Sequence, residues 1–178
     1  MEVFLRCEIP DVPGRLATLA GAIGESGGDI QAVEVVQRTP DTVIDDLWVQ
    51  TRDLATMVEH IEALEDTAIV HTGPSRGLPG DAVARLSTGI DALLSGAMSP
   101  EDGLPTLIGG LLFADSAELV EPHEWPTKRN RRVLRLQVVG GVLVLRREYR
   151  FLDAEIQRAH QVLTVCERAA AIAAGHVR

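Results

Sequence analysis

At the start of the chain, strand-like and helix-like patterns of apolar residues follow one another in an order that is compatible with few folds. Residues 2–9 alternate apolar and polar side chains, a pattern typical of a half-buried strand. A turn containing Pro13 and Gly14 follows, and Asp11 is positioned to cap the next helix. That helix shows one apolar stripe over residues 16–23. The chain is therefore expected to begin with a strand, a sharp turn and an amphipathic helix.

Two further strands, a second helix and a last strand complete the pattern. Alternating runs at 30–38 and 43–51 are joined by a short Pro/Asp linker, which indicates a hairpin. Asp53 can cap a helix with an apolar stripe over 54–64, and a short strand follows at 67–72. Right-handed crossovers fold this β-α-β-β-α-β order into a four-stranded antiparallel sheet with both helices on one face. The predicted fold class is α+β, with a ferredoxin-like first domain.

The helix-free face of this sheet is expected to be bare. It would carry Phe4, Arg6, Glu8, Glu34 and Trp48. Their neighbours of opposite parity would face the helices, namely Val3, Leu5, Val33, Val35, Leu47 and Val49. An exposed Phe and Trp make the bare face a candidate partner surface, and packing under the second domain is the alternative.

Composition and charge change near residue 75. Residues 74–80 are rich in Gly and Pro and are interpreted as a linker between domains at 1–73 and 81–178. Residues 1–75 hold four Arg against fourteen Asp and Glu, whereas the rest of the chain has a net charge of +1. An acidic first domain repels phosphates, which argues against nucleic-acid binding there.

The second domain is predicted to be a small α+β unit. Helices are expected from Asp81, over 104–112 and from Asp153, and strands over 117–120, 133–138 and 141–146. The hairpin around Gly140-Gly141, followed by Phe151-Leu152-Asp153-Ala154-Glu155 opening a helix, is similar to the closing part of a GAF domain in shortened form. This resemblance implies a sensing or packing role.

The segment Asp11-Val12-Pro13-Gly14-Arg15-Leu16 resembles the D-x-P-G-x-L turn of the ACT domain family. The resemblance continues through Gly27-Gly28-Asp29-Ile30, where the family has Asn-Ile entering the second strand, and it covers about residues 3–73. It implies a domain that pairs with itself and binds a small amino acid between the turn and a neighbouring subunit. The ligand-binding residues it implies are Asp11, Val12, Pro13, Gly14, Arg15, Leu16, Asp29 and Ile30. Asp29 stands where the family has Asn, which leaves the identity of the effector open.

The chemistry of this turn suits a zwitterion. Gly14 lets the backbone approach a ligand closely, and the start of the helix presents N–H groups to a carboxylate. Asp11 and Asp29 can accept hydrogen bonds from an ammonium group. The alternative is structural: Asp11 only caps the helix, Pro13 and Gly14 only form the turn, and Asp29 only ends it.

A basic stretch in the second domain has several interpretations. It comprises Lys128, Arg129, Arg131, Arg132, Arg135, Arg146, Arg147 and Arg150. Such a stretch binds nucleic acid or phosphate, forms a solvated hairpin loop, or faces an acidic partner such as the first domain. Nucleic-acid binding is the least favoured of the three.

No pattern in the sequence indicates an enzyme, a metal site or a cofactor. The five His are scattered, and His123-Glu124 lacks the second His of a zinc helix. There is no phosphate loop, dinucleotide fingerprint or nucleophile elbow, and Asp45-Asp46 points its carboxylates to opposite faces of a strand. The two cysteines suggest free buried thiols in the cytoplasm, with no signal peptide and no membrane span expected.

These observations predict a cytoplasmic, non-catalytic regulatory protein that forms a homodimer and binds an amino acid or similar small metabolite. Two rival functions remain. The first domain could be a ligand-independent interaction module, or the chain could be the regulatory subunit of a separately encoded amino-acid biosynthetic enzyme.

Overall fold

The structure is a computed structural model that describes residues 1–121 and 130–176. These residues form five helices and two antiparallel sheets, which confirms the α+β class. The chain divides into two compact units, Met1–Pro79 and Gly80–Arg178. Within the described ranges, no helix has the length and apolar character needed to cross a membrane.

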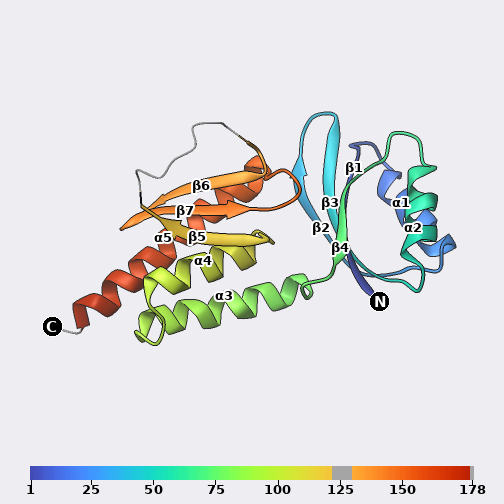
Figure 1. Cartoon of the computed structure of the whole chain (residues 1–178). Helices are drawn as coiled ribbons and strands as arrows, with labels where there is room; N and C mark the ends of the chain where they lie inside the picture. Colours follow the sequence, from blue (N-terminus) through green and yellow to red (C-terminus); the bar gives the residue numbers. More distant parts are fainter. Residues whose placement is uncertain (122–129, 177–178) are drawn as a thin grey trace. The chain divides into compact units, whose positions relative to one another are not determined.

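The first unit has the predicted β-α-β-β-α-β order. Its elements are β1 (Glu2–Pro10), α1 (Arg15–Glu25), β2 (Asp29–Arg38), β3 (Thr42–Gln50), α2 (Leu54–Glu62) and β4 (Ala68–Pro74). The strands pair antiparallel in the order β2-β3-β1-β4, so that β2 and β4 are the edges. Both helices lie on the same side of this sheet (Figure 1).

Local sequence determines where the two helices begin and end. The Asp53 carboxylate accepts a hydrogen bond from the Thr56 N–H at 3.1 Å, as predicted for the cap of α2. The α1 helix ends before Gly27, which has a φ of 81°, a left-handed conformation that favours glycine. Gly28 N–H then donates to the Ile23 carbonyl at 2.9 Å and closes the helix end.

The core of the first unit lies between the sheet and the two helices. Its buried members are Val3, Leu5, Cys7, Ile9, Leu19, Ile23, Val43, Leu47, Val49, Met57 and Ile61. The expectation that Val33 and Val35 are covered by the helices is wrong, because their exposed fractions are 42% and 50%. Both lie on β2, an edge strand whose register with β3 shifts twice, and the core centres on β1 and β3.

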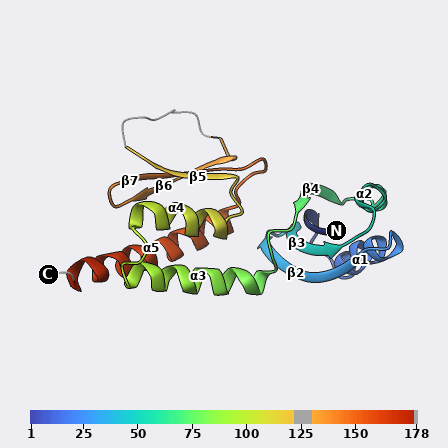
Figure 2. The ribbon, with the colours of Figure 1, turned by 60° about the horizontal axis from the view of Figure 1, so that its bottom comes forward.

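The second unit is a three-stranded sheet with three helices on one side (Figure 2). Its elements are α3 (Pro79–Leu94), α4 (Pro100–Leu111), β5 (Ser116–Val120), β6 (Val133–Val138), β7 (Gly141–Arg146) and α5 (Asp153–His176). The strand order is β5-β7-β6. The predicted hairpin turns at Gly140, whose φ is 91°, and α5 begins at Asp153 as expected. Resemblance to a GAF domain stays a prediction.

Candidate functional site

The turn between β1 and α1 is built from backbone hydrogen bonds and one glycine. Asp11 N–H donates to the Asp41 carbonyl at 3.0 Å, which joins the end of β1 to the β2–β3 hairpin. Gly14 has a φ of 92°, so a side chain at this position would be strained. Pro13 and Gly14 are both solvent-exposed. The turn thus presents its backbone at the surface.

The predicted capping role of Asp11 is wrong. The residue at the N-cap of α1 is Gly14, three positions later, and no side chain caps this helix. The Asp11 carboxylate instead accepts from the Nε of Arg38 at 3.1 Å, across the neighbouring hairpin. The first N–H groups of α1 consequently have no side-chain cap. The Arg38 guanidinium contacts Asp11 at the end of the sheet where this helix begins.

The other side chains of the turn point in several directions. Arg15 donates to the Glu65 carbonyl at 3.0 Å and to Asp66 Oδ2 at 3.1 Å, which ties the start of α1 to the segment after α2. Val12 and Leu16 are 54% and 39% exposed. Two apolar side chains therefore face solvent beside the turn.

Asp29 and Ile30 lie far from the turn within one chain. Asp29 pairs with Gln50, which in turn pairs with Glu2 at the start of β1. The turn follows Pro10 at the other end of this nine-residue strand, so the two ends are about 25 Å apart at ~3.3 Å per residue. Ile30 packs against the core. One chain alone does not bring the eight predicted ligand-binding residues together.

Asp29 remains available at the surface. It is exposed, and its Oδ2 accepts a hydrogen bond from Gln31 at 2.7 Å. Arg38, which the sequence prediction did not include, is also exposed at 63% of its side chain. Asp29 and Arg38 are the first and last residues of β2. Their opposite charges at the two ends of one strand are the sequence feature from which Arg38 could have been predicted as a site residue.

Asp45 is a second residue that the site prediction missed. It lies on the helix side of β3, paired with Cys7 of β1, and is 1% exposed. Burial raises the pKa of the Asp45 carboxyl, the Arg38 charge lowers it in part, and Asp11 raises it. Its Oδ1 has no hydrogen-bond partner among the residues that the structure describes. Asp45 is thus an unfavourable buried acid close to the Asp11–Arg38 pair.

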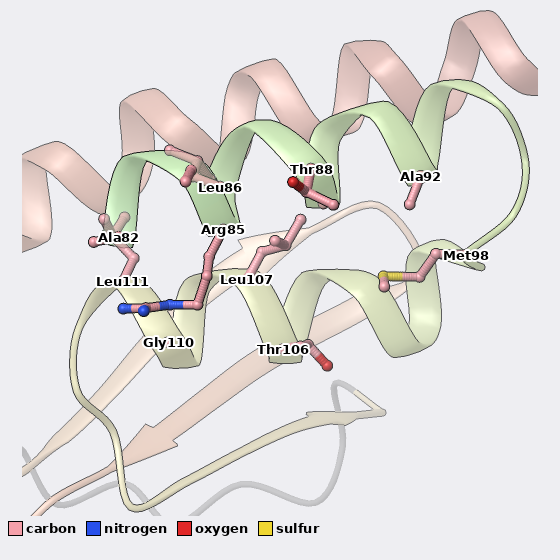
Figure 3. A pocket seen from close by; sticks show the side chains of 12 residues that line it. Ala82, Arg85, Leu86, Thr88, Ala92, Met98, Thr106, Leu107, Gly110 and Leu111 are labelled. Carbon is pink, nitrogen blue, oxygen red and sulfur yellow. The ribbon is translucent and has the colours of Figure 1, made fainter. Parts of the chain in front are cut away.

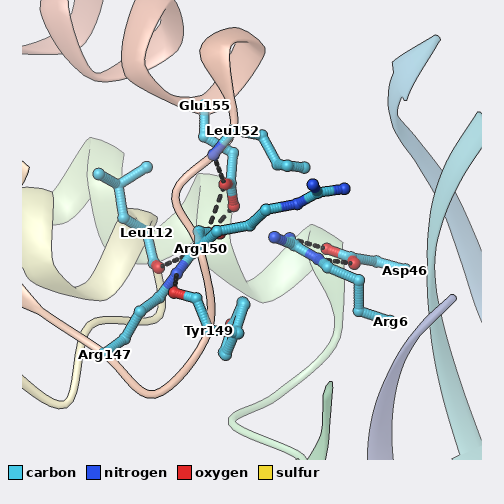
Figure 4. A network of polar contacts seen from close by, with 8 residues as sticks. All are labelled: Arg6, Asp46, Leu112, Arg147, Tyr149, Arg150, Leu152 and Glu155. Atoms are coloured by element: carbon cyan, nitrogen blue, oxygen red, sulfur yellow. Dashed lines mark hydrogen bonds and ion pairs between the residues drawn. The ribbon is translucent and has the colours of Figure 1, made fainter. Parts of the chain in front are cut away.

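The opposite face of the sheet is not bare, and the prediction of an exposed Phe and Trp is wrong. Phe4 and Trp48 are 4% and 2% exposed, and their rings pack edge to face at 5.5 Å. The Arg6 guanidinium lies 5.9 Å from the Phe4 ring centroid and donates to both carboxylate oxygens of Asp46 (Figure 4). This face is an aromatic and ionic cluster.

Two arginines of the basic stretch in the second unit form ion pairs within that unit. Arg147 is buried and pairs with Glu155 (Figure 4), and Arg146 pairs with Glu118. Arg147 is consequently unavailable to a nucleic acid. Lys128, Arg129, His123 and Glu124 lie outside the described residues.

Comparison with known proteins gives no family. No protein-family model and no curated protein matches the chain. The ligand-free regulatory subunit of aspartate kinase from Thermus thermophilus aligns over 94% of this chain and 91% of its own, with 13% identity and a TM-score of 0.40. An unknown protein from Galdieria sulphuraria gives the same coverage and identity with a TM-score of 0.37. A protein from Bacteroides thetaiotaomicron covers 96% and 94%, with 13% identity and a TM-score of 0.34.

Such low identities and TM-scores carry no functional assignment. The fold of the first unit rests on its own element order and strand pairing.

Proposed function

We propose that the chain is a non-catalytic regulatory protein that binds a free amino acid at a site completed by a second copy of itself. The observation that carries the proposal is the position of two opposite charges on edge strand β2, with Asp29 at its start and Arg38 at its end. An amino acid presents an ammonium and a carboxylate, and these two side chains have the matching charges.

A second copy is needed because the two charges lie at opposite ends of one strand. An edge strand has an unpaired row of backbone N–H and C=O groups and readily pairs with a copy of itself. Full antiparallel pairing of the ten-residue β2 would put Asp29 opposite Arg38 of the partner subunit. Two-fold symmetry would create two equivalent sites, one at each end.

The turn after β1 would form the wall of each site. Asp11 already contacts Arg38, so the exposed backbone of Gly14 and the uncapped start of α1 lie at the same end of the sheet. The ligand carboxylate would bind Arg38 and the helix start, and its ammonium would bind Asp29 of the partner subunit. A ligand that bridges two copies stabilises the dimer over the monomer, and that differential affinity is the regulatory signal.

A thermal-shift screen of the twenty amino acids on the full chain tests this function. An effector at about 100 times its dissociation constant should stabilise the protein by about 2.7 kcal/mol and raise Tm by several degrees. Asp29→Asn and Arg38→Gln should each remove most of the shift, whereas Asp41→Asn, in the adjacent turn, should leave it intact. No shift with any amino acid at millimolar concentration would exclude the proposed function.

Ligand-independent assembly is the second candidate. It is favoured by exposed apolar side chains of the first unit, which are Val33 and Val35 on edge strand β2 and Val12 and Leu16 in and beside the turn. A dimer whose Tm does not respond to amino acids would support this candidate instead.

A further inference from the structure

A groove lies between α3 and α4 of the second unit, outside the site described above. It has a volume of about 460 Å³, within the ordinary range of small-molecule pockets. Its lining is mostly apolar and includes Leu86, Ala92, Met98, Leu107 and Leu111 (Figure 3). A cavity of this size and character can take an aliphatic chain.

Two glycines explain why the groove exists. At Gly89 the helices touch, since a Cβ there would lie 2.0 Å from Cδ2 of Leu107. At Gly110 a Cβ would meet nothing within 4 Å. The first glycine lets α3 and α4 approach closely, and the second leaves space beside the point of contact that no side chain fills.

One cation lies in this lining, whose other polar side chains are those of Thr88 and Thr106. Arg85 extends from α3 toward α4 and ends beside Gly110 and Leu111 (Figure 3). Its side chain is exposed, and no ion pair or hydrogen bond joins it to the part of the chain that the structure describes. A guanidinium is a planar donor that binds a carboxylate through two hydrogen bonds.

We propose that this groove binds an aliphatic monocarboxylate, with the hydrocarbon chain along Leu107 and Met98 and the carboxylate on Arg85. Burial of the chain supplies the affinity, and the guanidinium selects an anionic headgroup over a neutral or cationic one. The site lies in the second unit, so the inference goes beyond the proposed amino-acid function and does not depend on it.

Titration of the full chain with octanoate, followed by ¹H–¹⁵N NMR and calorimetry, tests the proposal. Saturable shifts are expected at Ala92, Met98 and Gly110. Octylamine should bind at least about tenfold more weakly, the difference expected for one charge-assisted contact. Arg85→Gln should weaken octanoate binding by a similar factor, and Arg85→Lys should recover part of it.

Gly110→Leu is the occlusion variant. Its side chain should fill the groove without a clash and abolish binding, whereas Gly21→Leu, an exposed helical position in the first unit with equally open surroundings, should bind octanoate as the unmodified chain does. Equal affinity of octanoate for the unmodified chain and for Arg85→Gln would overturn the proposal. The proposal would also be overturned if the unmodified chain fails to bind octanoate and forms a dimer that the Gly110→Leu substitution dissociates. A second copy of the chain would then be the occupant of the groove.

Discussion

The Arg147 guanidinium and the Glu155 carboxylate form a buried, two-point ion pair, with Nη1 to Oε1 at 3.0 Å and Nη2 to Oε2 at 2.6 Å (Figure 4). Arg147 also lies 4.0 Å and 4.2 Å from the ring centroids of Tyr149 and Phe151. Glu155 accepts the Leu152 N–H at 2.8 Å. One pair therefore joins the end of β7 to the first turn of α5.

Removal of the negative charge from this pair should destabilise the second unit strongly. Glu155→Gln keeps the size of the side chain but leaves the Arg147 cation buried without a counter-charge, which should cost about 3–5 kcal/mol in the free energy of unfolding. Glu118→Gln breaks the exposed pair with Arg146 and should cost under about 1 kcal/mol. Urea denaturation of both variants measures the difference, and equal losses would contradict this account.

Asp45→Asn should stabilise the first unit at neutral pH. Burial raises the folded-state pKa of Asp45, so ionisation costs more in the folded than in the unfolded protein. This penalty is absent below the unfolded pKa, grows between the unfolded and the folded pKa, and is constant above the folded pKa. The gain on substitution should amount to about 1.4 kcal/mol per pH unit between the two pKa values, and it should vanish toward pH 3.8.

Asp46→Asn is the matched control for Asp45→Asn. Asp46 Oδ1 and Oδ2 accept from Arg6 at 2.6 and 2.7 Å, so the substitution breaks a good ion pair and should destabilise the protein by about 3 kcal/mol or more at pH 7. Denaturation midpoints measured at pH 7 and pH 4 distinguish the two carboxylates. A loss of stability in Asp45→Asn at pH 7 would show that its ionised form is favourable.

The element order of the first unit could be predicted because each element has a local signal. Alternation identified β1, Asp53 capped α2, and the glycines after α1 ended it. The site was less predictable, because its charged residues are far apart in the sequence and come into contact only when the strands of the sheet are paired. Asp11 contacts Arg38 only because the β2–β3 hairpin folds back beside the turn, and nothing local to Asp11 indicates this partner.

The alternation of residues along each strand predicted correctly which face of the first sheet Phe4, Arg6 and Trp48 lie on. It did not predict that they are buried. Phe4, Arg6 and Trp48 do share the face opposite the helices, yet they are buried. Arg6 pairs with Asp46 because the two residues are directly opposite in the β1–β3 register. Such a register follows from the whole hairpin and sheet rather than from any short pattern, so the ionic cluster on this face was not visible in the sequence.

Gly28→Ala should destabilise the first unit through overpacking. A Cβ at this position would lie 2.7 Å from Cγ2 and 3.0 Å from the carbonyl oxygen of Ile23, so the end of α1 must shift, at a cost of about 1–3 kcal/mol. Gly21→Ala, inside the same helix with open space around it, should instead stabilise by up to about 1 kcal/mol. Thermal denaturation of both variants should shift Tm in opposite directions.

The thiol of Cys7 should be inert in the folded protein. Burial and the nearby charges of Asp45 and Asp46 raise its pKa to about 12. At pH 8 only about one molecule in ten thousand would carry the reactive thiolate, even where a reagent could reach it. In a Cys166→Ala background, a disulfide reagent should label Cys7 at the rate of global unfolding and rapidly in urea. Fast labelling without denaturant would contradict the burial of this thiol.

Val35→Lys should convert the predicted dimer into a monomer. Val35 is 50% exposed on edge strand β2, and a charged side chain on an edge strand opposes pairing with another strand. Val139→Lys replaces a more exposed valine, at 82%, in the β6–β7 turn and should leave the dimer intact. Sedimentation equilibrium at micromolar concentration measures the mass of each variant. Because the amino-acid site needs Asp29 of the partner subunit, Val35→Lys should also lose the amino-acid-dependent rise in Tm, and a monomer that keeps this rise would place the whole site within one chain.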